Sequence, residues 1–122
     1  MCNFRTLYFN AGKLFAALKL NKADGTYLKE LKRIQKQDLV ILDDFGLEHL
    51  DKPGRLMLLE IMEDRHGLKS TIITSQLPVK SWHEIIGDPT IADAVCDRLI
   101  HSAHRVELKG ESVRKKFQEN LT

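Results

Sequence analysis

Two adjacent carboxylates, Asp43 and Asp44, follow directly after the apolar run Leu39–Leu42. Neighbouring carboxylates repel one another, and leaving unpaired charges at the end of a buried apolar strand is costly. A bound cation would resolve both problems, because carboxylate oxygens are suitable ligands for Mg²⁺. An acidic turn that ends at Gly46 and holds no ligand explains the same residues. The pattern is therefore compatible with a Mg²⁺ site and also with an acidic turn that binds no ligand.

A strand that ends in Asp and is followed by a second acid has the Walker B arrangement. In that arrangement the first carboxylate holds Mg²⁺, often through water, and the second orients or deprotonates the attacking water. The next apolar run, Thr71–Thr74, is followed by Ser75 and Gln76. Because working residues of parallel sheets gather at the carboxyl ends of the strands, a polar side chain here could contact the same ligand. An ordinary strand exit rich in Ser and Pro is the alternative.

Two arginines, Arg98 and Arg114, have the side chain that suits phosphate. A guanidinium binds phosphate through two hydrogen bonds and stabilises the charge that spreads during phosphoryl transfer, although a single Arg is equally well a surface cation. His101 and His104 are three residues apart, but no third ligand follows at a usable spacing, so we expect no metal site there. Trp82 is expected to be a core or interface aromatic.

Short apolar runs alternate along the chain with longer segments of helical spacing. The runs expected to form strands are Thr6–Phe9, Leu39–Leu42, Thr71–Thr74 and, as an edge strand, Arg105–Leu108. The segments expected to form helices are Ala11–Leu20, Thr26–Lys36, Pro53–His66 and Thr90–His101. This alternation implies crossover connections and a parallel sheet, so the expected fold class is α/β. The continuous apolar character of LVIL and TIIT indicates strands that are buried on both faces.

The composition is that of a single globular domain. A length of 122 residues allows one domain, and a hydrophobic content of 43% is enough for a core. No apolar stretch approaches the roughly 20 residues of a membrane span, and the N-terminus does not resemble a secretory signal. Cys2 and Cys96 form no metal-ligand spacing. We therefore expect reduced thiols in a cytoplasmic protein without a membrane partner.

The net charge of +2 conceals an uneven distribution. Seven basic residues face two acids between Lys13 and Lys36, whereas eight acids face two bases between Asp38 and Asp64. The balance is basic again, six against two, from Arg98 to Lys116. Such blocks could place basic patches against a polyanion such as DNA. Solvated helix faces whose charges balance in three dimensions are the alternative.

Together these segments resemble the IstB family, the ATP-binding helpers of insertion-sequence transposases. The resemblance runs from about Phe4 to Lys116, which is most of the chain. It is carried by DGTYLKELKRI at Asp24–Ile34, by DLVILDDFGLEHL, and by LLEIMEDRHGLKSTIITSQLPVKSWHEIIGDPTIADAVCDRLIHSAHRVELKGESVRK. These long motifs follow one another in the right order and spacing. The related bacterial helicase loader DnaC shares the ATPase plan but fits less well.

The resemblance implies a fold and a set of partners. The fold would be a three-layer parallel sheet of the AAA+ P-loop NTPase type, with residues 1–122 forming the second half of the ATP-binding core. ATP and Mg²⁺ would be the cofactors of the full-length protein. DNA, a transposase and further copies of the protein itself would be its partners.

The resemblance also implies roles for individual residues. Asp43 would be the Mg²⁺-associated Walker B acid, and Asp44 the catalytic acid beside it, where many AAA+ enzymes have Glu. Gln76 falls at the sensor 1 position, where many have Asn. Arg98 looks like the arginine finger that acts on the ATP of a neighbouring subunit. Arg114, within GESxR, resembles sensor 2.

One motif of such a domain does not occur in this sequence. The phosphate-binding loop GxxxxGK[ST] is absent, because only Gly12 precedes a Lys, Leu14 comes next, and no glycine lies five residues before Gly12. By the resemblance, the strand that feeds this loop is also missing, from between the strand ending at Thr74 and the one ending near Leu108. We expect either that the last strand closes the gap by pairing with its neighbour, or that the chain has low stability and associates.

Two functions fit these observations. The first is part of an ATP-dependent DNA-transposition helper, a member of an ATPase lineage that hydrolyses ATP barely or not at all in this truncated form. The second is a DNA-binding or interaction remnant that works without nucleotide and uses the basic segments. A salt-dependent DNA affinity that ignores nucleotide would favour the second.

Overall fold

The computed structural model describes residues 4–102, with side chains through residue 99. The elements, in chain order, are β1 (Thr6–Asn10), α1 (Ala11–Asp24), α2 (Tyr27–Gln35), β2 (Leu39–Asp43), α3 (Lys52–Arg65), β3 (Ser70–Ile73), the 3-10 helix η1 (Val79–Ser81), α4 (Trp82–Ile86) and α5 (Pro89–Ser102). Three predicted strands and four predicted helices are therefore present, within a few residues of their expected ends. The predicted strand Arg105–Leu108 lies outside the described residues.

The three strands form one parallel sheet in the order β1-β2-β3. In the register, Asn10 at the end of β1 lies opposite Asp43 at the end of β2. Leu42 lies opposite Ile73, the last residue of β3. The three strands therefore end side by side at one edge of the sheet, with β2 in the middle. The predicted α/β class with a parallel sheet is confirmed.

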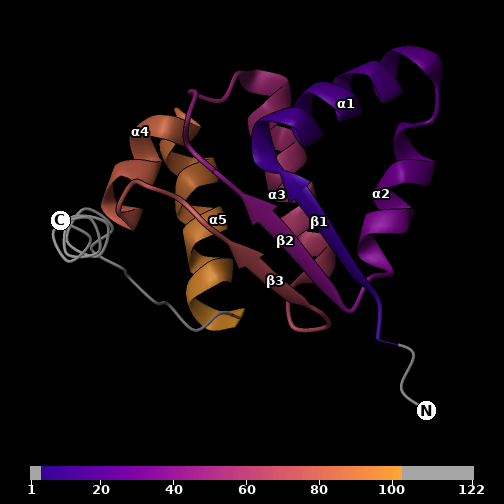
Figure 1. The fold of residues 1–122 in the computed structure, drawn as a ribbon. Coiled ribbons are helices and arrows are strands. Elements are labelled where there is room, and N and C mark those ends of the chain that lie inside the picture. The colour runs from indigo at the N-terminus through magenta and orange to yellow at the C-terminus, as the bar shows by residue number, and fades with distance from the viewer. Residues whose placement is uncertain (1–3, 103–122) are drawn as a thin grey trace, which may run out of the picture.

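The helices of the described residues cover one face of this sheet, which lies in front of them in Figure 1. Val40 and Leu42 of β2 point into the helical side and are fully buried. Successive residues of a strand point to opposite faces, so Tyr8, Ile41 and Ile72 share the other one. On that face Tyr8 is 60% exposed and Ile72 is 46% exposed.

Two layers of the expected three are thus present in residues 4–102, one of strands and one of helices. The prediction that β2 and β3 are buried on both faces is wrong for this part of the chain. The physical reason is that the apolar side chains on the second face of β2 and β3 need a covering layer, and none of the described helices lies on that face. The uncovered surface, which we call the open face, carries the side chains of Tyr8, Ile41 and Ile72.

Capping residues mark the ends of the longer helices. The Asn10 side chain accepts a hydrogen bond from the Lys13 N–H at the start of α1, and Gly25 ends that helix in the left-handed region at φ 84°. At α3, Asp51 accepts from the Gly54 N–H, and Pro53 lies in the first turn as predicted. None of the helices within residues 4–102 is both long and apolar enough to cross a membrane.

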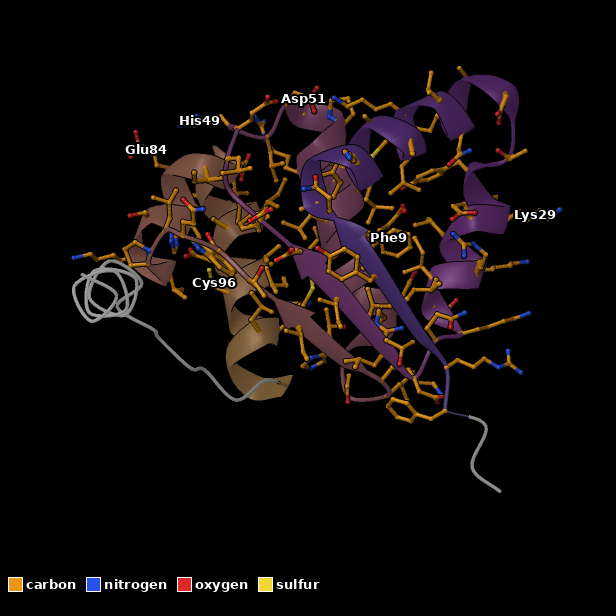
Figure 2. The ribbon with its side chains drawn as sticks, viewed as in Figure 1. Phe9, Lys29, His49, Asp51, Glu84 and Cys96 are labelled. Atoms are coloured by element: carbon orange, nitrogen blue, oxygen red, sulfur yellow. The ribbon has the colours of Figure 1, made fainter. Side chains whose placement is uncertain are left out.

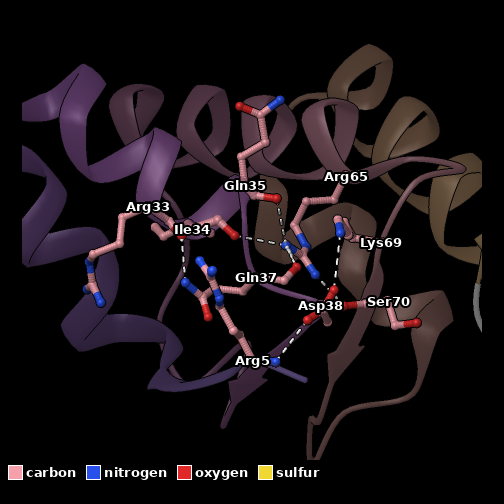
Figure 3. Close-up of polar contacts among 9 residues, drawn as sticks. All are labelled: Arg5, Arg33, Ile34, Gln35, Gln37, Asp38, Arg65, Lys69 and Ser70. Carbon is pink, nitrogen blue, oxygen red and sulfur yellow. Dashed lines mark hydrogen bonds and ion pairs between the residues drawn. The ribbon is translucent and has the colours of Figure 1, made fainter. Parts of the chain in front are cut away.

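One buried cation fastens the helices to the amino-terminal edge of the sheet (Figure 3). Arg65, at the end of α3, is only 1% exposed. Its guanidinium donates to the main-chain oxygens of Ile34 and Gln37, each at 2.8 Å, and of Ser70 at 2.5 Å. Its Nε donates to the Thr71 hydroxyl at 2.9 Å. Arg65 therefore joins the end of α2, the entry to β2 and the start of β3.

Candidate functional site

The Asp43 carboxylate lies where the three strands end, and two hydroxyl groups hold it there. Thr74, directly after β3, donates its hydroxyl hydrogen to Asp43 Oδ1. Tyr8, on β1, donates its phenolic hydrogen to Asp43 Oδ2. All three strands of the sheet thus contribute to the position of one carboxylate.

Asp44 follows in an unusual backbone conformation. Its φ of 56° lies in the left-handed region, which is costly for a residue other than glycine and is most common at functional sites and tight turns. Its N–H donates to the Thr74 hydroxyl oxygen at 3.1 Å. Gly46 is also left-handed, at φ 94°. The chain therefore turns sharply after β2, at Asp44.

The loop after β2 is attached to the loop after β3. The Phe45 N–H donates to the main-chain oxygen of Thr74 at 2.8 Å, and the Ser75 hydroxyl donates to the main-chain oxygen of Phe45 at 2.6 Å. The Phe45 ring packs edge-on against Trp82, with ring centroids 4.8 Å apart. Trp82 is buried, so its predicted place in the core is confirmed. These contacts fix the two segments that carry the acids and Thr74.

The charge of Asp43 is set by these contacts. The hydrogen bond from Thr74, followed by that from Tyr8, lowers the pKa of the Asp43 carboxyl, while desolvation acts in the opposite direction. The same bond to Asp43 is the largest cause that raises the pKa of the Tyr8 phenol. Asp43 is therefore an anion and Tyr8 a neutral donor at neutral pH. Among the described residues, no Lys, Arg or His forms an ion pair with Asp43 or Asp44.

The arrangement of these groups fits Mg²⁺. The side-chain atoms of Asp43, Thr74 and Tyr8 that meet here are all oxygens, and Asp43 and its neighbour in sequence, Asp44, have no counter-ion among residues 4–99. Mg²⁺ is commonly held by one or two carboxylates, several waters and the phosphates of a substrate. No group of three or more His, Cys, Asp or Glu side chains in the described part of the chain is placed so that it could hold a metal ion by itself. Asp43 and Asp44 would hold the ion jointly with a phosphate-bearing ligand.

The structure shows no hydrogen bond between this pair and the other predicted site residues that it describes, Gln76 and Arg98. Gln76 lies two residues beyond Thr74, is exposed, and has no hydrogen bond to Asp43 or Asp44. Arg98 on α5 donates to the Ala94 oxygen and to Glu63 of α3, each at 3.2 Å. Arg114 lies outside the described residues.

Arg98 lies toward the other ends of the strands from Asp43 and Asp44. Its partner Glu63 is in the last turn of α3, close to Arg65, which contacts the start of β3. Asp43 is at the opposite ends of the strands. Within one chain, Arg98 and Asp43 thus belong to opposite ends of the strands.

The sequence drew attention to the two acids but not to the hydroxyls that hold them. In the sequence, Thr74 ends the apolar run Thr71–Thr74, and Tyr8 lies within the apolar run Thr6–Phe9. The signal for Tyr8 lies in the register, because Tyr8 lies opposite Ile41 and therefore shares a face with Asp43, two residues on. That register is not readable before the strands are paired.

A second feature is a basic surface on α1 and α2. All seven basic residues between Lys13 and Lys36 are exposed. Two of them form ion pairs, Lys19 with Asp51 and Arg33 with Glu30, and Lys22 lies over the Tyr27 ring, 4.7 Å from its centroid. Lys29 extends away from the molecule in Figure 2. The solvated part of this hairpin therefore has an excess of positive charge.

Comparison with known proteins identifies the family. The sequence model of the family described as "IstB-like ATP binding protein" matches residues 2–120. An insertion sequence ATP-binding protein of Sinorhizobium fredii, y4pL, is 56% identical over 109 residues, which is 89% of this chain and 44% of that protein. A second from the same organism, y4uH, is 46% identical over 113 residues, 93% of this chain and 46% of that protein. The chain thus spans about half the length of these relatives.

Solved structures support the fold. The DnaC helicase loader superposes with a TM-score of 0.61 at 23% identity, over 80% of this chain and 57% of that chain. A DNA replication initiation factor superposes with a TM-score of 0.70 at 18% identity, over 98% of this chain and 36% of that chain. At these identities the likeness concerns the fold alone. The match to the family over nearly the whole sequence shows that this chain belongs to the IstB-like ATP-binding proteins.

Proposed function

We propose that this chain carries the acidic, metal-binding side of the Mg²⁺–ATP site of a DNA-transposition helper. The observation that supports this most is the Asp43–Asp44 pair at the end of the central strand, without a counter-ion among the described residues and next to Thr74. Asp43 holds the hydrated Mg²⁺, and Asp44 orients the water that attacks the terminal phosphate. The family and its insertion-sequence relatives agree with this assignment.

The remaining roles are part of the same proposal. Gln76 contacts the terminal phosphate of ATP once a nucleotide lies at the strand ends. Arg98 serves a neighbouring copy in an oligomer on DNA, since in its own chain it pairs with Glu63 and lies toward the other ends of the strands from Asp43. Arg114 completes the phosphate contacts. The transposase is the protein partner that this assembly directs to its target.

Hydrolysis by the chain alone is expected to be very slow. The sequence contains no GxxxxGK[ST], so no glycine-rich loop or lysine from this chain cradles the phosphates. Phosphoryl transfer depends almost wholly on positioning and charge stabilisation, and both require that loop. The acids then bind Mg²⁺–nucleotide weakly without turning it over.

The test is a phosphate-release assay on the purified chain with Mg²⁺–ATP, with Asp44→Asn as the comparison. We expect both proteins to release phosphate at the rate of the buffer control. Turnover by the unmodified chain that Asp44→Asn abolishes would contradict the proposed inactivity, while supporting the role of the acid. Turnover that survives the substitution would point to a contaminating enzyme and would call for a repeat with a new preparation.

A second candidate function is nucleotide-independent DNA binding, which is favoured by the exposed basic residues of α1 and α2. Its test is the affinity for duplex DNA as a function of salt, because each phosphate contact adds to the slope. Lys29→Glu together with Lys32→Glu should weaken binding if this surface faces DNA. An affinity unaffected by Mg²⁺–ATP would assign this function to the chain, and the absence of salt-dependent binding would reject it.

A further inference from the structure

Among the described residues, Tyr8 is the one exposed aromatic side chain with a hydrogen bond to the candidate site. It is 60% exposed on the open face, and its hydroxyl donates to Asp43 Oδ2. The other tyrosine, Tyr27, makes a bond of the same chemical kind elsewhere, donating to Glu60 Oε2 at 2.7 Å. Two phenol–carboxylate bonds thus occur in one chain, one at the site and one away from it.

The bonds from Tyr8 and Thr74 restrain Asp43 from two sides. Each carboxylate oxygen accepts one hydroxyl hydrogen, Oδ1 from Thr74 and Oδ2 from Tyr8. Since a carboxylate offers about four lone-pair positions, two bonds fix its plane and leave positions for a metal ion or its waters. Asp43 is therefore oriented before any ligand arrives.

We propose that Tyr8 and Thr74 are positioning residues that orient Asp43 for the metal ion of the nucleotide site. This inference rests on the Mg²⁺ role proposed above for Asp43. Groups that hydrogen-bond a metal-binding carboxylate hold it in its binding orientation, and their removal typically weakens metal affinity about 10-fold to 100-fold. Tyr8 acts from β1 and Thr74 from the end of β3, so the site depends on the pairing of all three strands.

A purely structural role predicts something different. If the Tyr8 bond only joined β1 to β2, its loss would lower the thermal midpoint and leave the metal affinity unchanged. Tyr8→Phe keeps the ring and removes only the hydroxyl, and Tyr27→Phe is the matched control for losing a phenol–carboxylate bond. Thr74→Val keeps the β-branched shape while removing the hydroxyl at Oδ1.

The experiment is a Mn²⁺ titration of the isotope-labelled chain, followed by paramagnetic broadening of main-chain amide signals in NMR spectra. Mn²⁺ replaces Mg²⁺ as the probe, and the signals of Asp44, Phe45 and Ser75 report on the site. We expect Tyr8→Phe and Thr74→Val to weaken the apparent Mn²⁺ affinity about 10-fold, because each removes a hydrogen bond that orients the metal-binding carboxylate. Tyr27→Phe should leave it unchanged.

Asp43→Asn separates failure of this inference from failure of the proposed function. If broadening near Asp44 persists in Asp43→Asn, or never occurs, the metal role of Asp43 is refuted and the positioning role with it. If Asp43→Asn abolishes broadening but Tyr8→Phe and Thr74→Val bind Mn²⁺ as the unmodified chain does, only the positioning role is refuted. Equal weakening by Tyr8→Phe and Tyr27→Phe would also refute it, since the effect would then be one of general stability.

Discussion

Replacing Arg65 by Met should destabilise the fold more than any substitution on the surface. The guanidinium is buried and donates to main-chain oxygens of Ile34, Gln37 and Ser70 (Figure 3). It also donates to the Thr71 hydroxyl. Burial lowers the pKa of this guanidinium, and the nearby Asp38 carboxylate acts in the opposite direction. Arg65 remains a cation at neutral pH, because an arginine titrates far above that range.

The magnitude follows from what the substitution leaves behind. Met fills part of the volume but donates nothing, so several buried main-chain oxygens lose their donor, and each such loss costs about 1 to 3 kcal/mol. The losses are not additive, because some of these oxygens can reach water. We therefore expect a loss of about 3 to 5 kcal/mol, the usual cost of breaking a buried charged network. Arg65→Lys should fall between, since it keeps the charge but not the planar fork.

The assay is urea unfolding followed by circular dichroism. Arg33→Met is the matched control, because Arg33 is exposed and its i, i+3 pair with Glu30 contributes only about 0.5 kcal/mol or less. The unfolding free energy should decrease in the order unmodified chain, Arg33→Met, Arg65→Lys, Arg65→Met. An unfolding free energy of Arg65→Met within about 1 kcal/mol of that of Arg33→Met would refute the structural role of Arg65, because a loss of that size is expected for an exposed ion pair.

Three further predictions concern single positions. Asp44→Asn should leave the thermal midpoint unchanged or slightly higher, because Asn tolerates φ 56° and no longer repels Asp43; a clear fall would contradict the strain argument. The hydrogen bond from the Arg5 N–H, followed by that from Lys69, lowers the pKa of the Asp38 carboxyl in the folded chain. The ionised Asp38 therefore stabilises the folded state above the unfolded pKa of about 4, and this contribution is lost as pH falls through the lower folded pKa. Unfolding free energy measured against pH should therefore fall less steeply on acidification in Asp38→Asn than in the unmodified chain, and equal slopes would reject this. Gly25→Ala should cost about 1 to 2 kcal/mol at φ 84°, whereas Gly12→Ala, inside α1 with its nearest contact at 3.6 Å, should add about 0.5 to 1 kcal/mol; chemical unfolding of both variants tests the opposite signs.

The elements of this fold were largely predictable because their signals are local. Each strand is a short apolar run. The helices α1 and α3 begin after Asn10 and Asp51, whose side chains cap them. The short helix α4 was not predicted, since its five residues are too few to show a period. The openness of one sheet face was not predicted either, because an apolar run records the need for cover and not whether cover is present.

The candidate site was predictable only in part. Two acids at the end of a strand form a local pattern, and the structure places Asp43 and Asp44 at the carboxyl edge of the central strand. Tyr8 and Thr74 depend on the pairing of three strands, and Arg65 depends on where two helices end, so none of these contacts is written in any single stretch of sequence. Non-local hydrogen bonds of this kind require the fold first.

We have proposed that Asp43 and Asp44 form the metal side of a nucleotide site. The most direct test is thermal unfolding of this chain with and without excess Mg²⁺–ATP, compared with the Asp43→Asn, Asp44→Asn double variant. A ligand that binds only the native state raises the midpoint. We predict a cooperative transition that rises with Mg²⁺–ATP in the unmodified chain and stays constant in the double variant. A transition that ignores Mg²⁺–ATP in the unmodified chain, or a rise that survives in the double variant, would contradict the claim.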